Sequence, residues 1–379
     1  MVFTSYSNII SPLGFTSEEN YAAIREGKTG VGKIVLPFSR EPFCVAKIGE
    51  RAFEERAATL RDPSAHTRLE ALSILSIQDV LTRSGVDPAD KRTLLMYSTT
   101  KGNIDVLEGR YPSMDSGRAY LPAFAKQLQA YFGFSNTPVL VSNACISGLL
   151  AIIIARRFIE QGTYDDVIVC GGDILSEFTI SGFKSFNAMS PEPSRPFDAS
   201  RTGINLGEAV ATLLITNKKE LAAPYHTEIV SGASANDANH ISGPSRTGEG
   251  LLQALQHTLK HRDISDVGFI SAHGTATPFN DEMESIAFER AGLSAVPLNS
   301  LKGYYGHTLG AAGVLETALS LEAMKHQELI RSEGYAVKGV SGNVTVIGSH
   351  QPKAYSAFIK TASGFGGCNA AALFRKTGL

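Results

Sequence analysis

One cysteine and two histidines are the residues of this chain whose types and settings suit joint chemistry. Cys145 follows the apolar run Pro138–Val141 and precedes Ile146–Ala155, which is almost entirely apolar and typical of a buried helix. At a helix N-terminus, unpaired backbone N–H groups and the positive end of the helix dipole favour a thiolate and can hold an oxyanion. Cys145 is therefore a candidate nucleophile, although a lone cysteine is more often a buried structural residue.

The two histidines lie in segments rich in small residues. His273 stands in Ser271–Pro278 (SAHGTATP), directly after an expected strand, and His307 stands in Lys302–Gly313 (KGYYGHTLGAAG). Glycine and alanine around an imidazole leave the space that a substrate tunnel requires. Taken singly, each histidine is more often a core or capping residue. Because each follows a strand that has a counterpart at the matching place in the other half of the chain, a shared site is favoured.

One thiol with two neutral histidines suits a particular reaction. Loss of carbon dioxide from a malonyl thioester leaves an enolate whose oxygen needs two hydrogen-bond donors, and the carbanion then attacks an acyl group held on the cysteine. A zinc site is a competing interpretation, but local spacings such as CxxC or HxxxH are absent and no fourth ligand is evident. A Cys–His–Asp hydrolase is another, and it leaves the second histidine without a use.

The elements that must position these residues alternate between strands and helices, which is typical of an α/β protein. Short β-branched or leucine-rich runs predict strands at Thr93–Tyr97, Pro138–Val141, Asp166–Cys170, Ala211–Thr216, Val267–Ser271, Val296–Leu298, Ala354–Ile359 and Ala370–Phe374. Helical periodicity predicts helices at Thr67–Ser84, Arg118–Phe132, Ile146–Glu160, Gly248–His261, Asp281–Ala291 and Ala311–His326.

The expected strands form two series in matching order. The strand before the cysteine and the strand before His307 each lead into a helix of small or apolar residues. Matched order over such lengths predicts a duplicated unit and not a short-period repeat. Charged residues interrupt the pattern near Asn217–Thr227, so we expect the chain to divide into 1–222, with the nucleophile, and 223–379, with both histidines.

The composition disfavours several classes of protein. The 379 residues are 43% hydrophobic and 19% charged, which is ordinary for a globular protein of two or three domains. With 35 basic and 37 acidic residues mixed along the chain, no basic block marks a nucleic-acid site. Four scattered cysteines indicate free thiols in a reducing compartment, and no signal peptide is evident. The uncharged stretch Pro138–Ala155 has polar residues at its middle, so we expect a cytoplasmic protein without a membrane span.

The chain resembles the β-ketoacyl-acyl-carrier-protein synthases of the elongating Cys-His-His class, in the thiolase superfamily, because several long motifs occur in the same order as in that family. The resemblance covers essentially the whole length. Its segments are Ile10–Gly14, Asn143–Cys145, Arg195–Asp198 with Arg201, Gly203, Gly207 and Glu208, Asp237–His240, His273–Pro278, Lys302–Gly313 and Gly364–Asn369.

The resemblance implies a thiolase-like fold in which two duplicated α/β halves form five layers, α-β-α-β-α, usually in a homodimer. It implies that Cys145 takes an acyl chain from the phosphopantetheine of acyl-carrier protein and that this chain condenses with malonyl-acyl-carrier protein. Carbon dioxide is lost and 3-oxoacyl-acyl-carrier protein is formed. His273 and His307 would bind the malonyl thioester carbonyl, and neither a separate cofactor nor a metal is implied.

The resemblance also implies supporting roles behind the histidines. Lys302 would orient and tune this region, with Glu316 beside it. Asp281 and Glu284 would support the loop that carries His273. For Lys302 and Glu316 a buried structural ion pair is an equal alternative to direct chemistry.

A gate over the cysteine is implied as well. The backbone N–H groups of Cys145 and Phe365 would form the oxyanion hole, Phe365 would cover the thiol, and Phe183 would line the acyl pocket. Two departures from the family pattern lie here, because Ser363 stands where Phe is usual and Cys368 where Thr is usual. The gate is therefore expected to move differently or to admit a different chain.

Other departures concern the substrate. Asn143 and Ile146 flank the nucleophile where small or hydroxyl residues are common, and the segment Lys101–Tyr120 is short for the family. That segment often contributes to the dimer face and the acyl pocket. These differences favour a specialised pathway, such as a polyene or another secondary lipid, over housekeeping fatty-acid elongation.

Three other functions stay open at this point. A chain-length partner subunit of a heterodimer does no chemistry, but such subunits typically lose the nucleophile that this chain keeps. A chain-initiating malonyl decarboxylase uses the same triad without elongation. A thiol hydrolase would turn acyl thioesters into free acids without a malonyl donor.

Overall fold

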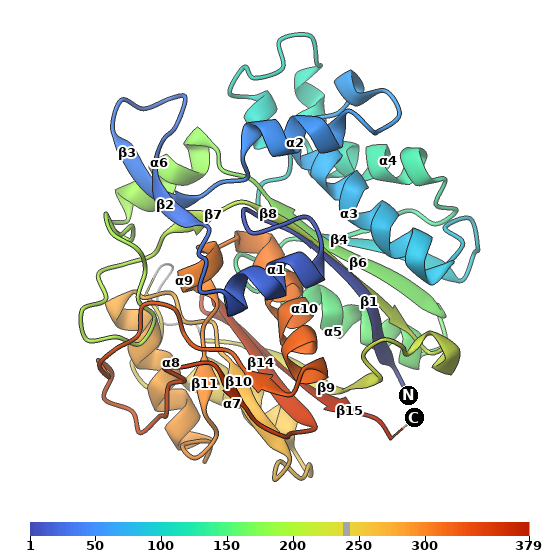
Figure 1. Ribbon diagram of the computed structural model, residues 1–379. Helices are drawn as coiled ribbons and strands as arrows, with labels where there is room; N and C mark the ends of the chain where they lie inside the picture. The colour runs from blue at the N-terminus through green and yellow to red at the C-terminus, as the bar shows by residue number, and fades with distance from the viewer. Residues whose placement is uncertain (238–242, 379) are drawn as a thin grey trace.

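A ten-stranded mixed sheet runs through the molecule (Figure 1). The computed structural model describes residues 1–237 and 243–378, so Ala238–His240 of the Asp237–His240 motif lie outside the described residues. The strand order is β11-β10-β14-β15-β9-β1-β8-β6-β4-β5. The strands of the first half are β1 (Phe3–Ile10), β4 (Thr93–Ser98), β5 (Val139–Val141), β6 (Asp166–Asp173) and β8 (Ala209–Thr216). Those of the second half are β9 (Thr227–Asn236), β10 (Val267–Ser271), β11 (Leu298–Asn299), β14 (Ala357–Gly364) and β15 (Cys368–Lys376).

The two halves of this sheet repeat one topology. In the first half β1 lies antiparallel to β8, β8 lies antiparallel to β6, and β6, β4 and β5 run parallel. In the second half β9, β15, β14, β10 and β11 take the same places with the same directions. The halves join where β1 pairs with β9. The predicted duplication is therefore confirmed in strand order, while the division of the chain at residue 222 stays a prediction.

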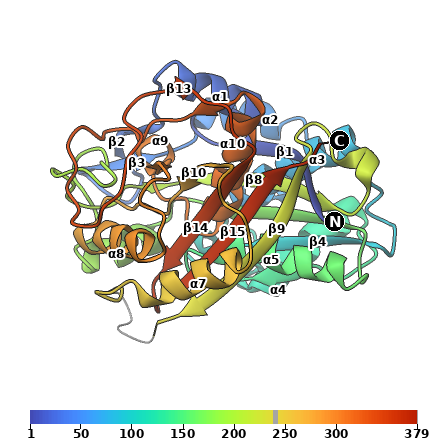
Figure 2. The same ribbon diagram turned by 90° about the horizontal axis from the view of Figure 1, so that it is seen from below.

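Helices complete the five predicted layers (Figures 1 and 2). The middle layer consists of α5 (Ser147–Glu160) and α10 (Ala312–Lys325), which contact each other and strands of both half-sheets. Outside the first half-sheet lie α3 (Arg68–Ser84) and α4 (Leu121–Phe132). Outside the second lie α7 (Glu249–Leu259) and α8 (Pro278–Arg290), and Figure 2 shows α7 below β15 and β9.

The two central helices position the candidate site. Every residue of α10 from Ala312 to Met324 is buried, as expected of a helix with protein on all sides. Gly148 of α5 and Gly313 of α10 lie against each other, so the helix backbones approach closely. Because α5 begins just after Cys145 and α10 begins soon after His307, this crossing holds the two loops side by side.

The sequence-based assignment holds for the elements that it named, but it missed the short helices Glu177–Ser185 and Lys302–Tyr305 beside the site and the seam between the halves. Each predicted strand and helix is present, with ends that shift by a few residues. The strands β1 and β9 were missed. In β1 the polar Ser5, Ser7 and Asn8 are buried, and they hide the alternation that marks a strand. Hydrogen bonds compensate for this burial, for example from Asn8 to the Phe15 carbonyl at 2.9 Å.

Shorter strands and helices lie around the ten-stranded sheet and its helices. They are β2 (Val31–Val35), β3 (Pro42–Ala46), β7 (Leu206–Gly207), β12 (Glu328–Leu329), β13 (Gln351–Pro352), α1 (Ser17–Arg25), α2 (Glu50–Ala57), α6 (Glu177–Ser185) and α9 (Lys302–Tyr305). Within residues 1–237 and 243–378, no helix combines the length and hydrophobicity that crossing a membrane requires.

Candidate active site

A cavity of about 420 Å3 contains the predicted triad. Cys145, His273 and His307 all line it, and one sulfur or nitrogen atom from each lies within 4.8 Å of the others. The two imidazole rings stand 5.0 Å apart between centroids, with an angle of 80° between their planes. The structure therefore brings together a thiol from the first half of the chain and two histidines from the second.

Cys145 lies in a tight turn between β5 and α5. The backbone of Ala144 is left-handed, with φ of 45°, which is uncommon for a residue with a side chain. Ser147 holds this turn, because its hydroxyl donates to the Ala144 carbonyl at 2.6 Å and accepts from the Asn143 N–H at 2.8 Å. The cysteine therefore lies at the N-terminus of α5 as predicted, and it is only 7% exposed.

Burial decides the protonation of this thiol. Loss of hydration, reinforced by the nearby Cys368, raises the pKa of Cys145 to about 12, although the charges of Lys302 and Lys101 act in the opposite direction. The neutral thiol is therefore the resting form at neutral pH, in contrast to the thiolate expected from the sequence. That expectation considered the helix end and not the desolvation of the sulfur, which is the larger effect here. The thiol must consequently lose its proton in the course of acylation.

His307 presents an N–H group to the cavity. Its Nδ1 accepts the backbone N–H of Leu309 at 3.3 Å, so the proton of the neutral ring lies on Nε2. That Nε2 is buried and has no hydrogen-bond partner among the described residues. Burial lowers the pKa of His307 well below its ordinary value, and the charges of Lys302 and Lys360 lower it further. The imidazole is therefore a neutral donor with a free N–H.

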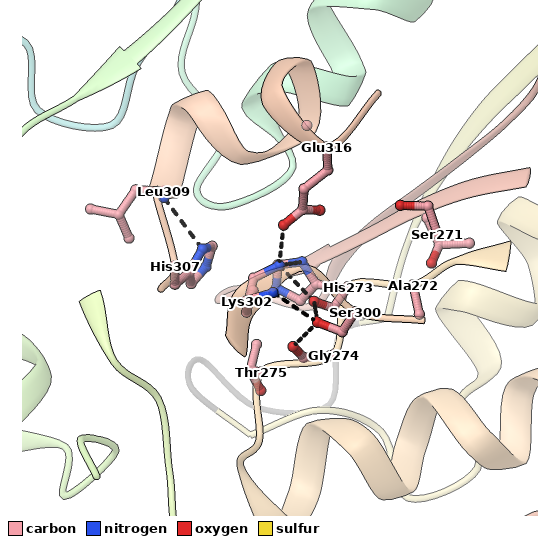
Figure 3. Close-up of polar contacts among 12 residues, drawn as sticks. Ser271, Ala272, His273, Gly274, Thr275, Ser300, Lys302, His307, Leu309 and Glu316 are labelled. Carbon is pink, nitrogen blue, oxygen red and sulfur yellow. Dashed lines mark hydrogen bonds and ion pairs between the residues drawn. The ribbon is translucent and has the colours of Figure 1, made fainter. Parts of the chain in front are cut away.

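His273 is held by its backbone and by its ring (Figure 3). Its backbone N–H donates to Glu284 at 2.8 Å, and its carbonyl accepts from Lys302 at 2.6 Å. The Lys302 ammonium also lies 3.3 Å from Nδ1, and an ammonium only donates, so the ring proton again lies on Nε2. Burial lowers the pKa of His273 well below its ordinary value, followed by the charge of Lys302.

Two carboxylates of α8 hold the loop that carries His273. Glu284 accepts the backbone N–H of Gly274 at 2.6 Å in addition to that of His273. Asp281 accepts the N–H of Thr275 at 2.8 Å and that of Phe197 at 2.7 Å. Both carboxylates are buried, and burial raises the pKa of Glu284 to about 7, with Asp281 adding to the shift. Their role in supporting catalysis stays a prediction.

A buried ion network lies next to His273, and Figure 3 shows its pair of Lys302 and Glu316. Glu316 binds Lys302 through Oε1 at 2.8 Å, as expected, and it binds Lys360 through Oε2 at 2.7 Å. Burial would raise the pKa of Glu316, but the two ammonium groups hold it below its ordinary value. Lys360 was not predicted from the sequence. Its one signal was a lysine directly after the apolar residues Ala357–Ile359 of β14.

Aromatic rings lie beside the triad. Phe365, in the turn between β14 and β15, stacks on Phe183 at 5.6 Å and meets the edge of Phe186 at 5.5 Å. All three rings line the cavity, and Phe365 is 36% exposed. Gly364 abuts the nucleophile so closely that a Cβ there would lie 3.0 Å from the Cys145 nitrogen. The geometry is therefore compatible with the predicted gate, whose role stays a prediction.

The two departures in this turn make local contacts. Ser363 donates its hydroxyl to Asn369 at 2.8 Å, and the Asn369 amide donates to the Gly367 carbonyl at 2.9 Å. The Cys368 thiol lies 3.4 Å from the Phe365 carbonyl. Both side chains are buried, so they brace the turn between β14 and β15 from inside.

The histidine tautomers also bear on the metal alternative. Metal binding requires an unprotonated ring nitrogen, whereas His273 and His307 turn N–H groups toward the cavity. With one buried thiol and two N–H donors, the site fits a negatively charged oxygen better than a metal ion.

Comparison with known proteins agrees with this geometry. Family models match for Beta-ketoacyl synthase, N-terminal domain, over residues 9–220 and for Beta-ketoacyl synthase, C-terminal domain, over residues 226–335. The chain is 27% identical to the tetracenomycin polyketide synthase ketoacyl synthase alpha subunit of Streptomyces glaucescens, over 97% of this chain and 95% of the relative. It is 26% identical to 3-oxoacyl-acyl-carrier-protein synthase 2 of Vibrio cholerae, over 97% of each. The solved ketosynthase ApeO in complex with its chain length factor ApeC, from Xenorhabdus doucetiae, matches with a TM-score of 0.83 and 25% identity, over 99% of this chain and 98% of the other. The chain therefore belongs to the β-ketoacyl synthase family, the acyltransferases of 3-oxoacyl-acyl-carrier-protein synthase type that act in fatty-acid and polyketide biosynthesis.

Proposed function

We propose that this chain takes an acyl group from acyl-carrier protein onto Cys145 and condenses it with malonyl-acyl-carrier protein to give carbon dioxide and 3-oxoacyl-acyl-carrier protein. One observation carries the proposal: a thiol and the N–H groups of two neutral histidines meet in one cavity, within 4.8 Å. A thiol can hold the acyl group, and two donors can hold the oxygen of the enolate.

The first half-reaction is acyl transfer. The sulfur of Cys145 attacks the carbonyl carbon of the acyl thioester, and the thiol proton passes to the departing pantetheine sulfur. A sulfur–carbon bond forms on Cys145, the bond to the pantetheine sulfur breaks, and that sulfur leaves with the proton. The backbone N–H groups of Cys145 and Phe365 hold the oxyanion, which the close packing of Gly364 on the Cys145 nitrogen supports.

The second half-reaction forms the new carbon–carbon bond. Malonyl thioester loses carbon dioxide, and the electron pair of the broken bond passes to the enolate, whose oxygen accepts from Nε2–H of His273 and His307. The carbanion attacks the acyl carbonyl, and the bond to Cys145 breaks. The sulfur leaves as a thiolate and takes up one proton from solvent. Two neutral imidazoles suit this step because each donates a hydrogen bond and is too weak an acid to protonate the enolate.

The surrounding residues have positioning roles in this proposal. Lys302 and Glu316 orient the ring of His273, Asp281 and Glu284 hold its loop, and Phe183 lines the acyl pocket. Buried position and direct hydrogen bonds support the first four assignments. The place of Phe183 in the cavity wall supports the last.

Partner and pathway follow from the same family. We propose acyl-carrier protein as the partner that delivers both thioesters, a homodimer as the assembly, and the cytoplasm as the location. A chain length factor accompanies the similar ketosynthase ApeO, so a heterodimer is the competing assembly. Because Ser363 and Cys368 depart from the family pattern, we propose a specialised lipid or polyene pathway in preference to housekeeping fatty-acid elongation.

The test is acylation followed by condensation. The protein is incubated with acyl-carrier protein carrying acyl chains of several lengths, and intact masses are taken for the wild type, Cys145→Ala and Cys170→Ala. Cys170 is a second buried cysteine, in β6, and serves as the control. We expect the acyl mass on the wild type and on Cys170→Ala but not on Cys145→Ala. The preferred length then appears as the strongest adduct.

Malonyl-acyl-carrier protein is added next. Release of carbon dioxide together with 3-oxoacyl product supports condensation, whereas carbon dioxide without that product indicates a chain-initiating decarboxylase. Free acid without malonyl donor indicates a hydrolase. Absence of any adduct and any product contradicts the proposal and favours a partner subunit.

A further inference from the structure

Lys360 is a charged residue in the buried centre of the second half-sheet. It lies within β14, and no part of it is exposed to solvent. Lysine is almost never fully buried unless it is paired, because an ammonium loses its hydration there. A lysine in this place therefore calls for a specific set of partners.

Those partners lead directly to His273. The Lys360 ammonium donates to the carbonyl of Ser271 at 3.0 Å and lies 3.3 Å from that of Ala272. These two residues immediately precede His273, and Ser271 pairs with Lys360 across β10 and β14. The ammonium also lies 2.7 Å from the Thr361 carbonyl and 2.7 Å from Glu316. The strand end that carries the histidine is thus bound to the central helix α10 through one lysine.

Lys302 binds the next backbone carbonyl after the two that Lys360 binds. Its ammonium donates to the carbonyl of His273 at 2.6 Å and to Oε1 of Glu316, the oxygen that Lys360 does not bind, at 2.8 Å. Three consecutive carbonyls, from Ser271 to His273, therefore accept from two ammonium groups that share one carboxylate. Such a network fixes both the position of the backbone and the orientation of the ring.

The charge of this network matters for the reaction. Two ammonium groups against the one carboxylate of Glu316 leave a positive charge behind the two imidazoles. A positive charge opposes protonation of an imidazole and stabilises a developing enolate. The titratable and charged groups that face His273 from the surrounding elements are Cys145, Asp281, Glu284, Lys302, His307, Glu316 and Lys360.

We propose that Lys360 is a positioning residue for the condensation: acting through Ser271, Ala272 and Glu316, it holds His273 in place and keeps both histidines as neutral Nε2–H donors. This inference rests on the proposed function. Lys360 touches no substrate in it, and its effect falls on decarboxylation more than on acyl transfer.

The test compares two lysines that bind the same strand. Lys360→Met removes the ammonium and keeps the unbranched shape. Lys353→Met is the control, because Lys353 also donates to a carbonyl of β10, that of Gly268 at 3.0 Å, but away from Glu316. We expect Lys360→Met to lower decarboxylation of malonyl-acyl-carrier protein by about tenfold or more, part of the roughly 10²–10³ seen when one oxyanion donor is lost. Acylation of Cys145 and the KM for the malonyl donor should change by less than about threefold, since the substrate contacts remain.

The pH profile separates this role from a structural one. Without the Lys360 charge the histidines protonate more easily, so the acid limb of the decarboxylation profile should move to higher pH by about one unit. Lys360→Gln keeps hydrogen-bond donors for the carbonyls and removes the charge, so it should show the same shift with a smaller loss of rate. Lys353→Met should keep the wild-type limb.

Two outcomes would overturn the inference. One is a Lys360→Met enzyme with wild-type rate and acid limb, or with losses that Lys353→Met reproduces. The other concerns the wild type, in long-range ¹H–¹⁵N spectra of the ¹⁵N-histidine protein whose peaks are assigned with single His→Gln variants. It is the finding that His273 or His307 is an imidazolium at about pH 6, near the ordinary value. Failure of the proposed function is distinct, because the wild type itself would then form neither the Cys145 adduct nor product.

Discussion

Gly148 of α5 and Gly313 of α10 lie backbone to backbone, and neither has room for a side chain. A Cβ on Gly313 would lie 2.1 Å from the Leu149 nitrogen, and a Cβ on Gly148 would lie 2.8 Å from the Val314 nitrogen. The loops with Cys145 and His307 precede these two helices, so the glycine contact sets how closely nucleophile and histidine approach. The geometry of the site therefore begins with two residues that do no chemistry.

Gly148→Ala tests this relationship. The added methyl group must push α5 and α10 apart, so we expect the free energy of unfolding to fall by about 1–3 kcal/mol, as in other overpacked cores. Condensation should fall further than stability alone explains, because the triad separates. Gly182→Ala in α6 is the matched control, since a Cβ there meets nothing within 4 Å and should be neutral or slightly stabilising. Urea unfolding and condensation rates of both variants give the answer, and equal behaviour would contradict the glycine contact.

Buried neutral histidine makes stability depend on pH. The pKa of His307 is held well below its ordinary value in the folded protein, so between pH 6.5 and 5 only the unfolded state takes up that proton, taking about 6.5 as the ordinary value. The contribution of His307 to the free energy of unfolding should therefore fall as pH falls, by about 1.4 kcal/mol per pH unit. Urea unfolding of the wild type and His307→Gln over this range should show two lines with different slopes. The exposed His257→Gln is the control, and parallel lines for His307→Gln contradict the prediction.

The shared carboxylate should matter more for stability than either lysine. Glu316→Gln leaves two buried ammonium groups without a counter-charge, so we expect a loss of about 3–5 kcal/mol. Lys360→Met leaves Lys302 and Glu316 as a balanced pair and should cost clearly less. Glu55→Gln breaks an exposed pair with Arg51 and should change stability by no more than about 1 kcal/mol. Chemical unfolding of the three variants ranks them, and a Glu316→Gln protein as stable as Glu55→Gln would refute the buried network.

The contact between Phe183 and Phe365 beside the triad allows the predicted gate to be tested. Phe183→Ala removes the ring on which Phe365 stacks, a contact worth roughly 0.5–1.5 kcal/mol. Alkylation of Cys145 by iodoacetamide should therefore become about three- to tenfold faster, since the covering ring opens more often. Phe178→Ala changes an exposed ring on the same helix α6 and should leave the rate unchanged. Peptide mapping identifies the alkylated cysteine, and an equal rate in both variants argues against a gate at Phe365.

Much of the architecture could be predicted because its signals are local. The strand Val267–Ser271 was predicted with the bounds it has, and the helices after Cys145 and His307 begin within a residue or two of the predicted starts. The strands that join the halves could not be found in this way, since their pattern mixes buried serine and asparagine with apolar residues. Lys360 was missed for a related reason: a buried charge can be understood only with its partners, and these lie on other elements.

The amino-acid sequence by itself determined the order of strands and helices, the two matching halves and the three residues suited to thiol chemistry, because periodicity, turn residues and residue type are properties of short segments. Only the tertiary structure decided that Cys145 is a buried thiol, that both histidines carry their proton on Nε2, and that Glu316 is shared by two lysines. The physical reason is that hydration and hydrogen-bond partners depend on which distant segments pack together, and both determine protonation.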